Sequence, residues 1–144
     1  MAATYLGDIP GARFHIASVS AHASVASNGA AARLDSLGPF DHNIRVRNVY
    51  WQPTAADHAM TSTASYRQLT LRNGGAAGTG TAIIGSLNLT ATLASLGVRA
   101  FTMDSTATVA SGAQIYLSHG TVGGDHANGS VLVAGRFALS YEVI

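Results

Sequence analysis

The chain has 144 residues, a formal net charge of +1, no cysteine, and charged residues at only 10% of its positions. This length is that of one domain, and it is enough to bury about 70% of the surface that the unfolded chain exposes. The absence of cysteine excludes disulfides, a thiolate nucleophile and cysteine-ligated zinc. A net charge near zero argues against nucleic acid and anionic membranes as partners.

The first segment, residues 1–10, is expected to be a short extended arm. An aspartate and a proline interrupt it before the first arginine, so it lacks the apolar run of a secretory signal. Its apolar residues Tyr5, Leu6 and Ile9 are candidates for contact with a partner, because a terminal segment has little reason to stay ordered unless something binds it.

Beyond the arm, apolar residues recur with a period of two, which is the pattern of strands with one buried face. The pattern is clearest in the run from Val131 to Val143, whose odd-numbered residues are expected to be buried. Gly135 is expected to mark a bulge or bend, because the run is longer than an ordinary strand. Shorter runs of this kind contain the apolar pairs Phe14 and Ile16, Ile44 and Val46, Leu69 and Leu71, and Leu87 and Leu89.

The strand that begins near Ile44 has two candidate registers. Straight alternation places Tyr50 on the same face as Ile44. A bulge near Asn48 would instead place Val49 and Trp51 on that face. The sequence leaves both registers open.

Turn signals separate the strands and complete the prediction of the fold. Asn-Gly dipeptides, which tolerate the positive φ angles of hairpin turns, occur at Asn28–Gly29, Asn73–Gly74 and Asn128–Gly129. Residues 73–98 carry no charge, but glycines interrupt them, so we expect core and subunit contacts there and no membrane span. No segment has a helical period. The predicted fold class is therefore all-β: a single antiparallel β-sandwich over residues 1–144, with a jelly roll as one candidate arrangement.

The dipeptide Asp-His occurs at Asp41–His42, Asp57–His58 and Asp125–His126, and these residue types build acid–base dyads and metal sites. All three pairs stand in loop contexts, and adjacent residues on a strand point to opposite faces, so no pair forms a dyad by itself on a strand. No His-x-His or His-x-x-x-His spacing supports a metal site. We therefore interpret the pairs as turn residues that bind no metal, and His15 and His22 as packing residues.

No motif predicts an enzyme. The Gly-x-Ser-x-Gly elbow of serine hydrolases is absent, and Glu142 is the only glutamate, so paired-carboxylate chemistry has little support. The glycine-rich run NGGAAGTGTA lacks the Lys-Ser or Lys-Thr of a phosphate-binding loop and is expected to be a hairpin loop. We accordingly predict no catalytic residue, no cofactor and no metal ligand.

A candidate surface is the group Arg45, Arg47, Tyr50 and Trp51, which falls on a single predicted strand. Arginine beside aromatic residues suits stacking on bases or sugars, but on a strand it is more often a partner interface or a solvated face. All eight basic residues are arginine, the cation favoured in interfaces, although GC-rich codon usage would favour the same residue. A domain so thinly charged is hard to keep monomeric and is typical of an assembly component.

Three segments resemble small virion proteins of tailed phages that infect GC-rich actinobacteria: FDHNIRVRNVYWQPTAADHA, GTAIIGSLNLTATLASLGVRAFT and GTVGGDHANGSVLVAGRFALSYEVI. The resemblance extends over roughly residues 40–144 and lies in overall texture, with no motif from which functional residues can be transferred. The proteins resembled are head decoration or minor capsid proteins. The resemblance implies a β-sandwich that binds the outside of the major capsid lattice, often as a homotrimer, and stabilises the shell without chemistry.

Two other classes remain as alternatives to a decoration protein. The first is a carbohydrate- or receptor-binding module of a tail or head fibre, which would use Tyr50, Trp51 and loop carboxylates, with calcium bound as in many lectins. The second is a metal-dependent hydrolase. In the preferred class the partners are the major capsid protein and further copies of the chain. The expected location of the protein is the outer surface of the phage head, and neither nucleic acid nor membrane is expected as a partner.

Overall fold

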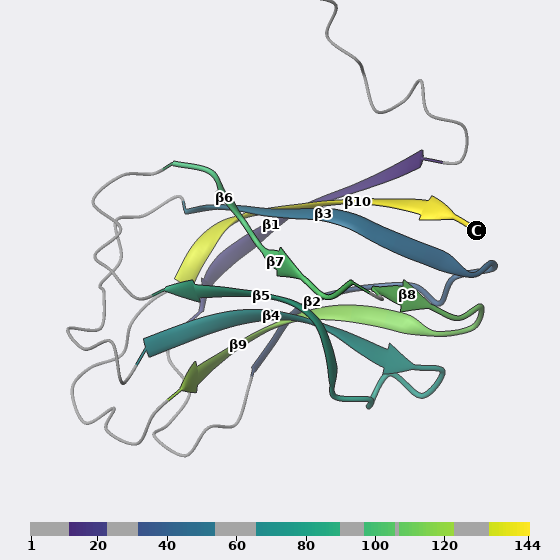
Figure 1. Cartoon of the computed structure of the whole chain (residues 1–144). Helices are drawn as coiled ribbons and strands as arrows, with labels where there is room; N and C mark the ends of the chain where they lie inside the picture. The colour runs from purple at the N-terminus through teal and green to yellow at the C-terminus, as the bar shows by residue number, and fades with distance from the viewer. Residues whose placement is uncertain (1–11, 23–31, 54–65, 90–96, 106, 123–132) are drawn as a thin grey trace, which may run out of the picture.

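The computed structural model describes residues 12–22, 32–53, 66–89, 97–105, 107–122 and 133–144, which form two antiparallel sheets packed face to face (Figure 1). Sheet A, the upper layer in Figure 1, contains β1 (Ala12–His22), β10 (Val133–Val143), β3 (Ile44–Pro53) and β6 (Arg99–Ala100), in this order, with β8 (Thr108–Val109) also paired to β3. Sheet B contains β2 (Ala32–Leu37), β9 (Gln114–Val122), β4 (Tyr66–Gly75), β5 (Ala82–Leu89) and β7 (Thr102–Met103), in this order. The prediction of an all-β sandwich is confirmed.

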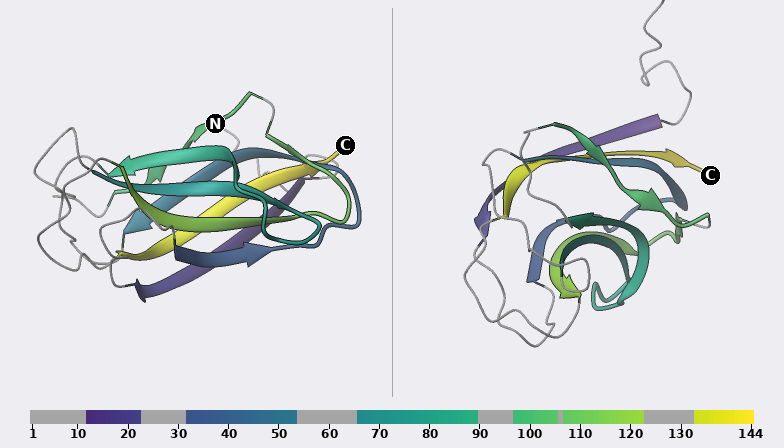
Figure 2. Two further views of the ribbon diagram at one scale, coloured as in Figure 1. Left: turned by 90° about the horizontal axis from the view of Figure 1, so that it is seen from below. Right: turned by 60° about the vertical axis from the view of Figure 1, so that its left-hand side comes forward.

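The order of pairing is that of a jelly roll. Strand β1 pairs with β10, β2 with β9, β3 with β6 and β8, and β4 with β5, so the pairs are nested one inside another along the chain. Two further pairings, β10 with β3 and β9 with β4, join the nested pairs into the two sheets. Nested antiparallel strands rolled into two layers define the jelly roll, a fold found in viral capsid and lectin domains. Figure 2 shows the two layers from two further sides, with sheet B the more strongly curled.

Both edges of the sandwich are connected between the sheets. At one edge, β6 pairs with β3 of sheet A and β7 pairs with β5 of sheet B, so the chain crosses between the layers at the buried Phe101. At the other edge, Nε2 of His15 on β1 lies 2.9 Å from Oδ2 of Asp35 on β2. In the part of the chain that the structure describes there is no helix with the length and apolar character needed to cross a membrane.

The core lies between the two sheets, and Trp51 and Phe137 are among its largest fully buried side chains. These two residues are register partners on β3 and β10. A Cβ atom built on Gly135 would lie 2.4 Å from the Trp51 ring and 2.6 Å from the carbonyl oxygen of Gln52. Gly135 is therefore explained by the close approach of a tryptophan. The expected irregularity is present beside it, between Val19 and His22 of the partner strand β1.

Strand β3 adopts the bulged register. Ser140 pairs with Asn48 and Tyr141 pairs with Val46, so Arg47 is an extra residue on β3. The bulge turns Val49 into the core and leaves Tyr50 exposed. Of the two registers that the sequence left open, the structure selects the bulge.

Burial along β10 follows the predicted alternation over most of the described strand. Phe137 and Leu139 are fully buried and Tyr141 is half-buried, as expected. Val143 departs from the prediction because it is exposed near the strand end, beyond the register shift at Ser140 and Tyr141.

The hairpin between β4 and β5 confirms the predicted hairpin loop, but its turn residues differ from those expected. Asn73 still pairs with Ala82 in the ladder, and the positive φ angles belong to Gly75 and Gly78. The amide of Gly78 donates to the carbonyl oxygen of Gly75, which closes the turn at 3.2 Å. A glycine run offers several positions with access to positive φ, and the turn forms between Gly75 and Gly78, beyond the Asn-Gly dipeptide. The other two Asn-Gly dipeptides lie outside the described residues.

Candidate partner interface

The outer face of sheet A carries a row of apolar side chains that crosses four strands. In the register of the sheet, Ile16 pairs with Ala138, Ala138 with Tyr50, and Tyr50 with Ala100. Directly paired residues share a face and lie close enough for their side chains to touch. Ile16 is 70% exposed and Tyr50 41% exposed, and Phe14, two residues before Ile16 on the same side of β1, is 50% exposed. We call these five residues the apolar row.

Charged residues flank the apolar row on both sides, toward the two ends of the strands that it crosses. At one end, Arg47 Nη2 donates a hydrogen bond to Glu142 Oε1, and Arg45 Nη1 lies 3.6 Å from the same oxygen. At the other end, Arg136 is exposed and pairs in register with Gln52. Three arginines and one glutamate leave this border with a net positive charge. The bulge contributes to the arrangement, because it adds Arg47 to the outward side chains of β3.

The outer face of sheet B is built differently, because its polar groups bond to one another. Thr70 Oγ1 and Ser118 Oγ are 2.6 Å apart and buried, and Nε of Arg72 donates to both at 3.1 Å. The same arginine donates through Nη1 to the carbonyl oxygen of Thr81 at 2.7 Å. The guanidinium of Arg33 lies 4.6 Å from the centre of the Tyr116 ring, in the geometry of a cation–π contact. These described polar side chains therefore bond within the face.

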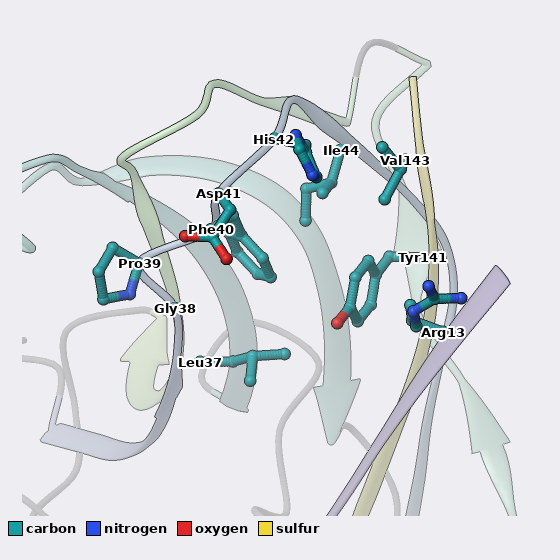
Figure 3. Close-up of a pocket in the computed structure, with 10 residues that line it drawn as sticks. All are labelled: Arg13, Leu37, Gly38, Pro39, Phe40, Asp41, His42, Ile44, Tyr141 and Val143. Carbon is teal, nitrogen blue, oxygen red and sulfur yellow. The ribbon is translucent and has the colours of Figure 1, made fainter. Parts of the chain in front are cut away.

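A cavity of about 530 Å³ opens where the segment before β3 passes the end of β10 (Figure 3). Its apolar wall includes Phe40 and Tyr141, whose rings meet edge to face with centroids 5.4 Å apart. Arg13, Asp41 and His42 provide the ionisable groups. The volume falls in the range of small-molecule sites.

The Asp-His pair at residues 41–42 is exposed, lines this cavity and lies in a bend. The main-chain oxygen of Asp41 accepts a hydrogen bond from Ser111 Oγ at 2.9 Å, and Asn43 Oδ1 accepts one from the Ser111 amide at 2.9 Å. This pair therefore has the loop position that the turn interpretation requires. The pairs at 57–58 and 125–126 lie outside the described residues, and within the described ranges no three His, Cys, Asp or Glu side chains come together as a group that could hold a metal.

The side of strand β1 that faces the core is opposite to the one that its sequence predicts. His15 faces inward, bonded to Asp35 and with its ring edge-on to Phe137 at 6.4 Å, whereas Phe14 and Ile16 face outward. The interpretation of His15 as a satisfied packing residue agrees with this geometry, and the side chain of His22 is not among those described. The expectation that Phe14 and Ile16 form the buried side is wrong, because the inward position opposite Leu139 is taken by His15.

The candidate interface residues separate into three groups. Arg45, Arg47 and Tyr50 lie on the outer face of sheet A, next to or within the apolar row. Trp51 is only 1% exposed, so its assignment to an interface is corrected: the bulge turns it into the core, where a partner does not reach it. Tyr5, Leu6 and Ile9 lie outside the described residues.

Of the buried polar residues that the structure describes, His119 is the least exposed. His119 is fully buried on β9, with register partners Ala32 and Leu69. Its position continues the inward alternation of Ile115 and Leu117, so the period of two was the signal that would have placed it in the core. No family model matches the chain, and no curated protein matches it.

Proposed function

We propose that this protein is a structural component of a phage head, a decoration protein that binds the outside of the major capsid lattice and stabilises it without catalysis. The observation that carries the proposal is the outer face of sheet A, where Ile16, Phe14 and Tyr50 expose large apolar surfaces on a fold with two connected edges. An exposed cluster of this kind on a folded domain marks a contact site for another macromolecule. The jelly roll is common among capsid domains, which is consistent with the proposal.

The exposed cluster is modest in size, which favours a partner that offers many identical contacts. A few exposed apolar residues give weak binding for one isolated contact. A homo-oligomer on a shell makes the same contact several times at once, and the linked contacts raise the overall affinity without new interactions. The proposed oligomer is a trimer, and its mass in solution can be measured by light scattering.

The direct test is sedimentation of the purified protein with phage heads from which tails and decoration have been removed. The expected result is saturable binding to heads, with no binding to isolated tails. Location at the tail tip, or a chain that stays monomeric and never associates with heads, would contradict the proposal.

The main alternative, a glycan-binding fibre module, is favoured by one feature, the cavity that Asp41 and His42 line. Burial of Trp51 removes the aromatic residue best suited to stacking on a sugar. Calcium-dependent binding to host glycans, lost in an Asp41→Ala variant, would favour this alternative over decoration.

The proposal also includes an anchoring role for the N-terminal arm. Deleting residues 2–10, which contain Tyr5, Leu6 and Ile9, is expected to weaken head binding about tenfold while the β domain stays folded, because the deletion removes the apolar contacts that the proposed arm would make with the partner. Sedimentation measures the binding, and circular dichroism confirms that the strands remain. Unchanged affinity in the folded deletion variant would remove the arm from the interface.

A further inference from the structure

We infer that the outer face of sheet A is the docking surface, and that the partner presents an acidic protein surface around an apolar centre. The inference rests on the proposed function, because it identifies which side of the domain faces the shell and what chemistry the shell supplies there.

The apolar row supplies the centre of the contact. Ile16, Ala138, Tyr50 and Ala100 follow one another across the sheet in direct register, so they form one continuous surface and not four scattered side chains. Phe14 extends this surface along β1. Interfaces commonly have an apolar, aromatic-containing centre surrounded by a polar rim.

The border of the row determines the charge of the partner. Glu142 is shared between Arg45 and Arg47, so two positive charges face one negative charge. Arg136 has Ser18 and Gln52 as its register partners, and neither is acidic. A second copy docked face to face would place one positive border against another, which electrostatic complementarity disfavours. Carboxylates on a different protein fit this border, and arginine is the side chain best shaped to bind them.

The outer face of sheet B is less suited to docking, because its described arginines already have partners within the chain. Among the side chains that the structure describes there, Arg72 bonds to Thr70, Ser118 and Thr81, and Arg33 contacts Tyr116 and the carbonyl oxygen of Gly78. Docking there would require a partner to replace bonds that already exist, with a cost for each polar group left unpaired.

The test compares matched substitutions on the two outer faces of the full-length protein. Ile16→Asp changes the apolar row, and Ile83→Asp is its control, because Ile83 is also exposed but lies opposite Arg72 on sheet B. Arg136→Glu changes the border, and Arg33→Glu is its control. Binding is measured by sedimentation with stripped heads, and thermal melting confirms that each variant is folded.

The expected result is at least a tenfold loss of affinity for Ile16→Asp and about a fivefold loss for Arg136→Glu, with both sheet B controls within about twofold of the wild type. Raising salt from about 0.05 to about 0.5 M should weaken wild-type binding, and less so for Arg136→Glu, because screening acts on the same charges.

Three outcomes would overturn the inference, and they differ in what else they overturn. If the wild type binds heads but the sheet A variants bind equally well, or the sheet B variants bind worse, the face is wrong and the proposed function stands. If the wild type binds no heads, both fail. If Ile16→Asp abolishes self-association and leaves head binding intact, the face is occupied by a second copy and the acidic partner is wrong.

Discussion

The two outer faces of the sandwich share a fold and differ in how their side chains are satisfied. On sheet B, Nε of Arg72 donates to the hydroxyl groups of Thr70 and Ser118, so these three polar side chains bond to one another. On sheet A, Ile16 and Tyr50 are exposed, and the neighbouring Arg45 and Arg47 share one carboxylate, that of Glu142. Alternation in a strand therefore fixes which residues face outward, and the chemistry of those residues decides whether the face bonds within itself or is open to a partner.

The largest expected change in stability distinguishes a substitution on the inner side of sheet A from one on its outer side. Gly135→Val should destabilise the domain by about 3 kcal/mol, because its Cβ has no space beside the Trp51 ring and the Gln52 carbonyl. Ala138→Val, three residues along β10 but within the outer apolar row, should change stability by less than about 0.5 kcal/mol. Urea unfolding measures both. Equal losses would mean that the outer face is as tightly packed as the core.

The second comparison replaces one arginine on each face by alanine. Arg72→Ala should cost about 1–2 kcal/mol, because it uncovers the buried Thr70–Ser118 pair and removes a donor to both hydroxyls. Arg136→Ala on sheet A should cost less than about 0.5 kcal/mol. The free energies of unfolding in denaturant give the result. A loss at Arg136 as large as that at Arg72 would show that sheet A is also internally satisfied.

The third comparison concerns the edge at which the two faces meet. Asp35→Ala should cost about 0.5–1 kcal/mol, because it removes the half-buried bond from His15 that joins β1 to β2. Asp41→Ala, at an exposed position beyond the end of β2, is the control and should be neutral within about 0.5 kcal/mol. Thermal melting distinguishes the two variants. Indistinguishable melting temperatures would show that the bond between His15 and Asp35 does not stabilise this edge.

A small effect on stability is expected from the double substitution Phe14→Ser and Ile16→Ser, which should change the free energy of unfolding by less than about 1 kcal/mol. The same change should roughly halve the fluorescence of a dye that binds exposed apolar surface, because it removes much of the apolar row. Ile83→Ser on sheet B is the control, and its dye signal should fall less. An equal fall in dye fluorescence would show that both faces expose comparable apolar surface.

Much of the fold could be predicted from the sequence because the period of two is a local property. Phe137 and Leu139 are buried as their alternation indicates, and the bulge on β3 was one of the two registers considered. The side of β1 that faces the core was not predictable in the same way. It depends on His15 meeting Asp35, twenty residues along the chain and on the other sheet.

The candidate surface could be predicted only where it lies on one strand. Arg45, Arg47 and Tyr50 belong to β3 and were recognised together, and Trp51 was wrongly added because its side depends on the bulge. The apolar row joins Ile16, Tyr50 and Ala100 through Ala138, so it exists only after the strand order is known. Strand order is set by long-range pairing, which a local pattern does not contain.

The nested pairing also sets the order of events during synthesis. Strand β10 lies between β1 and β3 in sheet A and is synthesised after the other described strands, so the pairing of β1 with β10 forms only late in translation. Contacts this distant in sequence make folding slow, on the scale of milliseconds to seconds for comparable β domains. A partner surface that spans β1, β10 and β3 is therefore complete only once β10 has been added. A nascent chain does not yet present the continuous surface that the mature domain offers.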